Sequence, residues 1–152
     1  MIEILDYSDE NKNFIKKLNV EWLEKYFAVE PNDEKQLSNP KEEIIDKGGM
    51  IFYARYKGET VGCAALMKVD EQTYELSKMA VTESHQGLGI GKKLIEHCLD
   101  IAQQQNIEKL ILYSNTKLQT AIEMYKKYGF KEIPFDSTHY KRANIKMELL
   151  LK

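Results

Sequence analysis

Long hydrophobic runs are absent from this sequence. Its longest apolar stretch, from Val61 to Met67, covers about seven residues, whereas a membrane-spanning helix needs about 20. Residues 1–12 contain four acidic side chains and lack the apolar segment of a secretory signal peptide. We therefore expect a cytoplasmic protein that does not enter a membrane.

Cysteine is scarce, and neither sign of charge is in large excess. Cys63 and Cys98 lie in apolar surroundings without metal-ligand spacing, so we expect both to be small buried side chains in a reducing compartment. The three histidines show no ligand spacing either, and we predict no metal. The 22 basic and 24 acidic residues are mixed along the chain, which argues against a nucleic-acid partner.

What the sequence does contain is the patterning of one compact domain. At 152 residues it can form a substantial core, and no repeat or linker divides it, so we expect a single domain over residues 1–152. Apolar periodicity and turn residues predict strands over residues 2–5, 50–57, 60–69, 73–81, 109–113, 130–133 and 143–151. The same signals predict helices over residues 9–27, 40–47, 90–105 and 116–128, with a short helix starting near Pro31.

The order β-α-α-β-β-β-α-β-α-β-β is that of a mixed α/β sandwich. It predicts about seven strands in one sheet with helices on both faces. Ser8 or Asp9 is expected to cap the first helix, and Thr116 with Gln119 to form a capping box. A polar loop joins the last two strands; it contains Pro134, Asp136, Ser137, Thr138 and His139.

Three glycines at alternate positions, Gly87, Gly89 and Gly91, stand between a strand-like and a helix-like run. A glycine-rich turn that opens a helix presents unpaired N–H groups and the positive end of the helix dipole, so it typically binds phosphate. Neither G-x-G-x-x-G nor G-x-x-x-x-G-K-[ST] matches, because Lys92 and Gln86 stand where these patterns require glycine.

Two motifs of the chain resemble those of the GCN5-related N-acetyltransferase (GNAT) superfamily. The first is Gln86-x-x-Gly89-x-Gly91, and the second is Asn115-x5-Ala121-x3-Tyr125-x3-Gly129-Phe130. Together with the element order, the resemblance covers almost the whole chain. It implies the GNAT fold and an acyl-CoA-dependent transferase, usually one that moves acetyl to a primary amine.

The resemblance also implies acetyl-CoA as cosubstrate. The loop amides would hold its pyrophosphate, and its pantetheine arm would hydrogen-bond to the backbone of strand 73–81. The residues implied are Met79, Ala80, Val81, Gln86, Gly87, Leu88, Gly89, Ile90, Gly91, Lys92, Asn115 and Tyr125. The alternatives are sheet core for Met79 and Val81, a solvated helix face for Lys92, and a helix N-cap for Asn115.

Two residues are the catalytic candidates. Tyr125 occupies the superfamily's tyrosine position and would protonate the departing thiolate; the alternative is a core tyrosine. Glu75 matches a strand glutamate that many members use as general base, and we expect it to share a strand face with Ser77, Met79 and Val81. The alternative for Glu75 is a solvent-facing side chain.

The acceptor side is less defined. Trp22, Tyr26 and Phe27 are candidates for lining an acceptor pocket, and Tyr140 and Arg142 for binding an acidic acceptor group. We predict direct attack by an amine-bearing acceptor in a ternary complex; a small molecule is favoured as acceptor, and a peptide or protein is the alternative. A non-catalytic acyl-CoA-binding sensor with the same fold remains the alternative. The last strand is long enough to pair across a homodimer.

Overall fold

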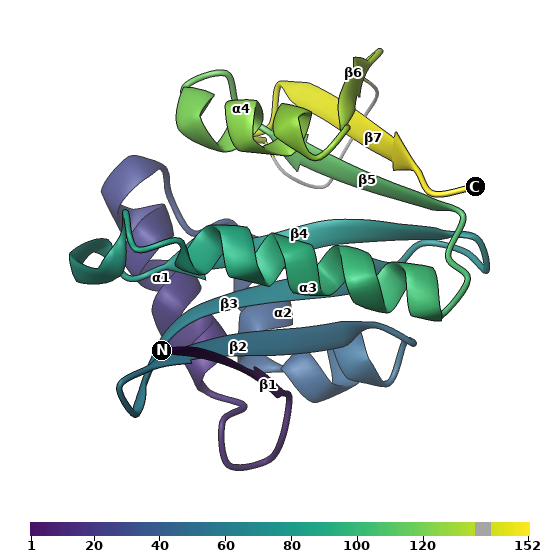
Figure 1. The fold of residues 1–152 in the computed structure, drawn as a ribbon. Helices are drawn as coiled ribbons and strands as arrows, with labels where there is room; N and C mark the ends of the chain where they lie inside the picture. Colours follow the sequence, from purple (N-terminus) through teal and green to yellow (C-terminus); the bar gives the residue numbers. More distant parts are fainter. Residues whose placement is uncertain (136–140) are drawn as a thin grey trace.

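A computed structural model describes residues 1–135 and 141–152, and its elements follow the predicted order (Figure 1). The strands are β1 (Ile2–Asp6), β2 (Met50–Tyr56), β3 (Glu59–Lys68), β4 (Thr73–Val81), β5 (Lys109–Ser114), β6 (Lys131–Ile133) and β7 (Ile145–Leu150). The helices are α1 (Phe14–Tyr26), α2 (Pro31–Ser38), the π-turn η1 (Lys41–Ile45), the 3-10 turn η2 (Glu83–His85), α3 (Ile90–Gln104) and α4 (Gln119–Lys127).

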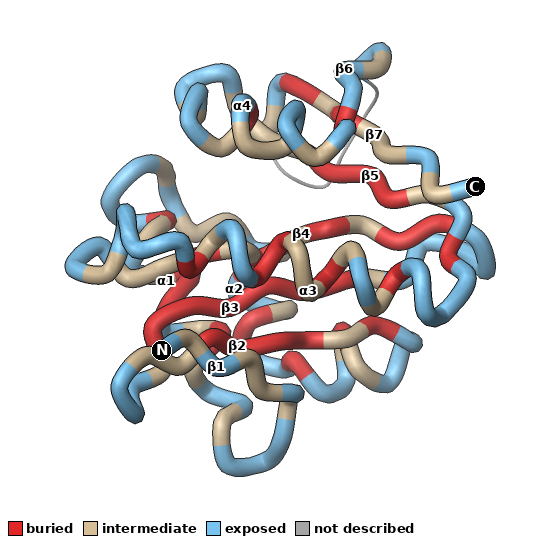
Figure 2. The backbone as a smooth tube through the Cα atoms, viewed as in Figure 1, coloured by how far each residue is buried: buried red, intermediate tan, exposed pale blue. Residues whose placement is uncertain are grey.

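The strands form one mixed sheet in the order β1-β2-β3-β4-β5-β7-β6. Among the strands of the described residues, only β4 and β5 pair in parallel, because α3 connects these two strands across one face of the sheet. Residues of α3 and α4 pack into one apolar cluster, and residues of α1, α2 and η1 pack into another on the opposite face. Figure 2 shows how much of β3 and β4 is buried between these layers. The predicted fold class is confirmed.

The first helix begins later than predicted. Residues 9–13 form turns, α1 starts at Phe14, and no side-chain hydrogen bond caps it. The Ser8 N–H donates instead to Asn11 Oδ1 at 2.8 Å, and Asn11 Nδ2 donates to the Asp6 carbonyl at 3.0 Å. These local bonds hold the segment in a turn, so the prediction that Ser8 or Asp9 caps α1 is wrong.

The predicted capping box of α4 is also wrong. The helix starts at Gln119, and the Thr116 hydroxyl accepts a hydrogen bond from Asn144 Nδ2 at 3.2 Å rather than one from its own helix. Gln119 Nε2 donates to the Thr116 carbonyl at 2.6 Å, not to the Thr116 N–H. The segment before α4 is thus tied to Asn144, the residue directly before β7, which the local sequence could not indicate.

The segment before β2 contains two short pieces. The helix expected near Pro31 is α2, which begins at that residue. The helix expected from Pro40 shrinks to the five-residue turn η1, after which residues 46–48 turn into β2.

The prediction that Glu75 shares a strand face with Met79 and Val81 is wrong. Tyr74 and Leu76 belong to the cluster under α3, and Met79 and Val81 pack against the same cluster. Side chains alternate along a strand, so Glu75 lies on the opposite face from these four.

A bulge in β4 causes this change of face. Two steps along β3, from Ala65 to Cys63, are matched by three along β4, from Ser77 to Ala80. Lys78 lies within this extra length and adopts a positive φ of 55°. One inserted residue puts the side chains after it out of phase with those before it.

The parallel ladder between β4 and β5 is short. It runs from Thr73–Lys109 to Glu75–Ile111 and then ends. Beyond this point the two strands diverge, with β4 staying beside β3 and β5 beside β7 (Figure 1).

The last strand lies inside the sheet. All of β7 pairs with β5, and its residues 146–148 also pair with β6, so those residues have neighbours on both sides. The predicted loop residues Asp136, Ser137, Thr138 and His139, and the acceptor candidate Tyr140, fall outside the described residues. Among the described residues no helix is both long and apolar enough to cross a membrane.

Candidate active site

Two cavities meet where β4 and β5 diverge. The larger, of about 530 Å³, lies between the glycine loop and α4, and the smaller, of about 160 Å³, lies between β4, β5 and α1. Four residues line both: Trp22, Met79, Leu118 and Ala121. Two reactants bound in the separate cavities would therefore meet beside Met79.

The glycine loop forms one wall of the larger cavity. Gly87 and Gly89 have positive φ angles of 85° and 81°, and a Cβ atom at either position would meet no atom within 4 Å. The need for glycine here is conformational, and the loop's outer side is open. Since Gly89 is the N-cap of α3, the helix N-terminus opens at the loop. Gln86 Nε2 donates to the Val81 carbonyl at 3.2 Å and ties the loop to β4.

Most of the predicted cofactor residues line this larger cavity. They are Met79, Ala80, Val81, Gln86, Gly87, Gly89, Ile90, Gly91 and Lys92. Leu88 lines neither cavity and is 48% exposed. Sequence reasoning missed Lys117, which also lines the cavity and whose Nζ lies 5.0 Å from the centre of the Phe27 ring. Its place two residues after Asn115, within the second motif, was the available signal.

The residues Met79, Ala80 and Val81 differ in the direction of their backbone. Ala80 is paired with Cys63 of β3. Two residues further along, the N–H of Thr82 donates to the Val61 carbonyl of β3 at 2.8 Å. Backbone groups alternate along a strand, so those of Met79 and Val81 point the other way, toward the diverging β5. Of these three residues, Met79 and Val81 can offer backbone groups to a ligand in the cleft.

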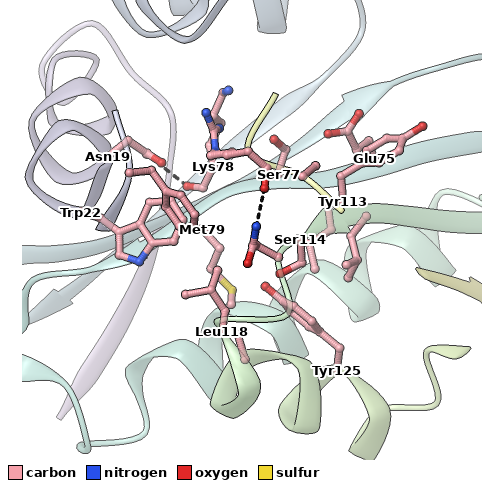
Figure 3. A pocket seen from close by; sticks show the side chains of 17 residues that line it. Asn19, Trp22, Glu75, Ser77, Lys78, Met79, Tyr113, Ser114, Leu118 and Tyr125 are labelled. Carbon is pink, nitrogen blue, oxygen red and sulfur yellow. Dashed lines mark hydrogen bonds between the residues drawn. The ribbon is translucent and has the colours of Figure 1, made fainter. Parts of the chain in front are cut away.

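Tyr125 projects from α4 into the smaller cavity (Figure 3). Its ring lies 5.9 Å from that of Phe130, which is buried. Burial raises the pKa of the Tyr125 hydroxyl to about 12, so the hydroxyl is protonated at neutral pH and can donate a proton or a hydrogen bond.

Glu75 lines the same cavity from the β4 side (Figure 3). Burial raises the pKa of its carboxyl above the ordinary 4.5, against the opposing effects of the Lys78 charge, a Ser77 hydrogen bond and the Lys146 charge. A carboxylate with a raised pKa is a stronger base than an ordinary one. The structure thus brings the two catalytic candidates to one cavity.

Asn115 also lines this cavity, and both polar atoms of its side chain are hydrogen-bonded to the backbone. Its Nδ2 donates to the Arg142 carbonyl at 2.6 Å, and its Oδ1 accepts from the Lys117 N–H at 2.8 Å. It is not the N-cap of α4, which is Leu118. In this arrangement its side chain shapes the β5–α4 turn.

Of the acceptor candidates, Trp22 and Phe27 line the smaller cavity, whereas Tyr26 lines only the larger one. Arg142 also lines the smaller cavity, but its guanidinium is bound to Asp33 by two hydrogen bonds of 2.6 and 2.9 Å. The role of Arg142 in this structure is therefore an internal ion pair.

A buried charge cluster borders the cavity, and sequence reasoning missed it. Asp33 is fully buried and accepts from Arg142 and, at 3.4 Å, from Lys78 Nζ. Burial alone would raise the pKa of Asp33, but the hydrogen bonds from Arg142 and the Glu30 N–H and the charge of Lys78 hold that pKa below 3.8. The cluster joins α2, β4 and the turn that precedes β7.

Cys63 and Cys98 are both fully buried, as predicted. Among the described residues no group of three or more histidine, cysteine, aspartate or glutamate side chains is placed to bind a metal ion.

Comparison with known proteins gives consistent matches. The model of the acetyltransferase (GNAT) family matches residues 14–130. A probable N-acetyltransferase of Drosophila melanogaster, san, is 27% identical over 145 residues, which cover 93% of this chain and 74% of that protein.

Two solved structures share the fold. A GNAT-family acetyltransferase from Staphylococcus aureus Mu50 has a TM-score of 0.88 and 24% identity, with both chains fully covered. The putative acetyltransferase yncA from Salmonella typhimurium, solved with acetyl-CoA, has a TM-score of 0.79 and 18% identity over 100% of this chain and 95% of the other.

Proposed function

The chain belongs to the acetyltransferase (GNAT) family and is an acyltransferase, and on that premise we propose that it moves the acetyl group of acetyl-CoA to a primary amine. The acceptor is a small molecule that binds in the smaller cavity, and transfer occurs directly in a ternary complex. The observation that carries this proposal is the junction of the two cavities at Met79, with Glu75 and Tyr125 lining the smaller one.

The larger cavity suits coenzyme A. The pyrophosphate would lie on the amides of residues 87–92, where loop N–H groups and the α3 N-terminus favour negative charge. The pantetheine arm would then follow the edge of β4 and bond to the backbone of Met79 and Val81. The bound acetyl-CoA of the yncA structure, which has the same fold, supports this assignment.

In the reaction the amine nitrogen forms a bond to the thioester carbonyl carbon, and the C–S bond breaks. The electron pair of that bond leaves with sulfur, which takes a proton from the Tyr125 hydroxyl. The acceptor ammonium first loses one proton to Glu75, directly or through water, and Glu75 passes that proton to solvent. After attack, the nitrogen of the adduct loses a second proton to solvent as the amide forms. The products are the acetamide and CoA thiol, and solvent returns the proton to Tyr125.

Glu75 has a defined task because most of the acceptor is protonated. An alkylamine with a pKa near 10.4 is free amine in only about one molecule in 10³ at pH 7. A positioned base typically contributes about 10²–10⁴ in rate, and the raised pKa of Glu75 suits this role.

Thermal unfolding with acetyl-CoA, CoA, ATP and NAD is the first test. A ligand at about 100 times its Kd that binds only the native state adds about 2.7 kcal/mol, which raises Tm by several degrees. We expect a rise with both CoA species and none with NAD. Absence of a rise with either CoA species would contradict the proposal.

A panel of primary amines with detection of released thiol then tests turnover. The panel contains alkylamines, polyamines, amino acids and short peptides at saturating acetyl-CoA. We expect turnover with a small amine. Binding of CoA without turnover of any amine would favour the non-catalytic sensor.

A further inference from the structure

Asn19 is a polar side chain in an apolar layer. It lies in the middle of α1, is 3% exposed, and belongs to the helix that packs against β3 and β4. A buried amide without partners is unfavourable, so its hydrogen bonds indicate what it is used for.

Its Nδ2 makes three contacts. It donates to the Ile15 carbonyl at 2.9 Å, to Cys63 Sγ at 3.3 Å and to the Lys78 carbonyl at 3.2 Å, the last of these drawn in Figure 3. Cys63 Sγ itself donates to the same Lys78 carbonyl at 3.3 Å. Two buried side chains from two different elements therefore converge on one backbone oxygen.

That oxygen belongs to the bulge of β4. Lys78 has φ +55°, a region that L-residues with long side chains rarely occupy, and such a conformation persists only when its surroundings hold it. The bonds from Asn19 and Cys63 are such a restraint. They fix the orientation of the peptide between Lys78 and Met79.

The same peptide carries the Met79 N–H. In a trans peptide the carbonyl and the N–H point in opposite directions. With the Lys78 carbonyl turned toward Asn19 and β3, the Met79 N–H points toward the cleft where β5 has diverged. Met79 lines both cavities, so this N–H faces the place where acetyl donor and acceptor would meet.

We propose that Asn19 is a positioning residue for acyl transfer: its amide holds the Lys78 carbonyl and thereby aims the Met79 N–H at the thioester carbonyl oxygen. This inference rests on the proposed function. As the amine attacks, negative charge develops on that oxygen, and a donor fixed in advance stabilises it. Asn19 also lines the smaller cavity, but in this role it acts through the peptide between Lys78 and Met79.

The test compares Asn19→Leu, which has nearly the same size and no donor, with the wild-type enzyme. Displacing a catalytic group by about 1 Å can lower the rate about 10²-fold. We therefore expect kcat of Asn19→Leu to fall by between about 10-fold and 10²-fold. The affinity for CoA should change far less than kcat, because the glycine loop and the Val81 backbone are untouched. The carbonyl stretch of bound acetyl-CoA labelled with ¹³C should move toward its value in free acetyl-CoA.

Leu18→Ala is the matched control. Leu18 is the neighbouring residue of α1, is 4% exposed and packs in the same apolar cluster. Its truncation should lower Tm but leave kcat and the carbonyl stretch unchanged. If Asn19→Leu does not fold, Asn19→Ala removes the same donor without added apolar bulk.

The outcomes separate this inference from the proposed function. A wild-type protein with neither turnover nor a shifted carbonyl stretch would refute the function itself. A wild-type protein with both, and an Asn19 variant that retains either wild-type kcat or the wild-type stretch, would refute only the role of Asn19.

Discussion

Tyr125 shows how one hydroxyl can be tested without disturbing its surroundings. Tyr125→Phe keeps the ring that packs near Phe130 and removes only the oxygen. We expect kcat to fall by about 10²-fold or more, because the thiolate then leaves without a proton donor. The Kd of CoA, measured by calorimetry, should remain unchanged. An unaltered kcat would return Tyr125 to a purely structural role.

The proposed role of Glu75 as general base predicts how the rate depends on pH. Its pKa is raised, so kcat/KM should fall as pH decreases through a value above 4.5, where the carboxylate becomes protonated. Glu75→Gln should lower kcat/KM by about 10²-fold or more and abolish that acidic limb. A pH–rate profile that is identical in the variant would exclude Glu75 as the base.

The same pKa shift has an effect on stability with a definite sign. The pKa of Glu75 is higher in the folded protein than in the unfolded chain. The protein therefore loses stability as pH rises above the pKa of the unfolded chain, because the unfolded chain ionises more readily. Glu75→Gln cannot ionise. We therefore expect Glu75→Gln to equal or exceed the wild-type Tm at pH 8, measured by calorimetry, and the difference to shrink toward pH 4.

At the scale of elements, two glycine variants can distinguish the glycine loop, residues 86–91, from an ordinary glycine turn. Gly89 at the start of α3 and Gly58 in the β2–β3 hairpin both have φ +81°, and a Cβ atom at either would meet nothing within 4 Å. Alanine at either position should cost about 1 kcal/mol, because its Cβ disfavours positive φ.

Only Gly89→Ala should weaken CoA binding, by about tenfold or 1.4 kcal/mol, since only that loop holds the proposed pyrophosphate site. Gly58→Ala is the control for the shared backbone strain. Equal CoA affinity in the two variants, measured by calorimetry, would remove the loop from the binding site.

Elements defined by a local pattern could be predicted from the sequence. The periodicity of α3, the short apolar strand β5 and the glycines of the loop are each a property of a few neighbouring residues. The face of the sheet on which the Glu75 side chain lies could not be predicted, because no sequence pattern indicates the bulge at Lys78.

Features that depend on contacts between residues far apart in the sequence could not be predicted either, because no local pattern indicates such contacts. The start of α4 is set by Asn144, which lies 28 positions from Thr116. Arg142 is paired with Asp33 over a separation of 109 positions, so the sequence around Arg142 gives no indication of its partner. The position of the proposed acceptor cavity depends on these long-range contacts.

At the scale of the molecule, two parts face each other across the cleft, joined by the short β4–β5 ladder and by the Asp33–Arg142 pair. Arg142→Ala leaves the fully buried carboxylate of Asp33 with the Lys78 charge and the Glu30 N–H. Breaking a buried pair in this way typically costs about 3 kcal/mol, and we expect Tm to fall by several degrees.

Lys41→Ala, which removes an exposed ion pair with Asp46, should cost less than about 1 kcal/mol and serves as control. The pKa of Asp33 is lowered by folding, so its contribution is present above pH 3.8 and is lost as pH falls through the folded value. The gap in Tm between wild type and Arg142→Ala, measured by calorimetry, should therefore narrow in acid. A gap that is independent of pH would contradict this account.

The divergence of β4 and β5 gives the sheet an edge in its interior. In the ladders of the described residues, β4 has no strand beside it on the β5 side beyond Glu75. Exposed strand edges are sites where another extended chain can add. In hydrogen-exchange terms, the amides of Met79 and Val81 belong to a sheet that a bound pantetheine arm would complete, and their exchange should slow when acetyl-CoA binds. The cosubstrate would then act as a removable strand of the fold.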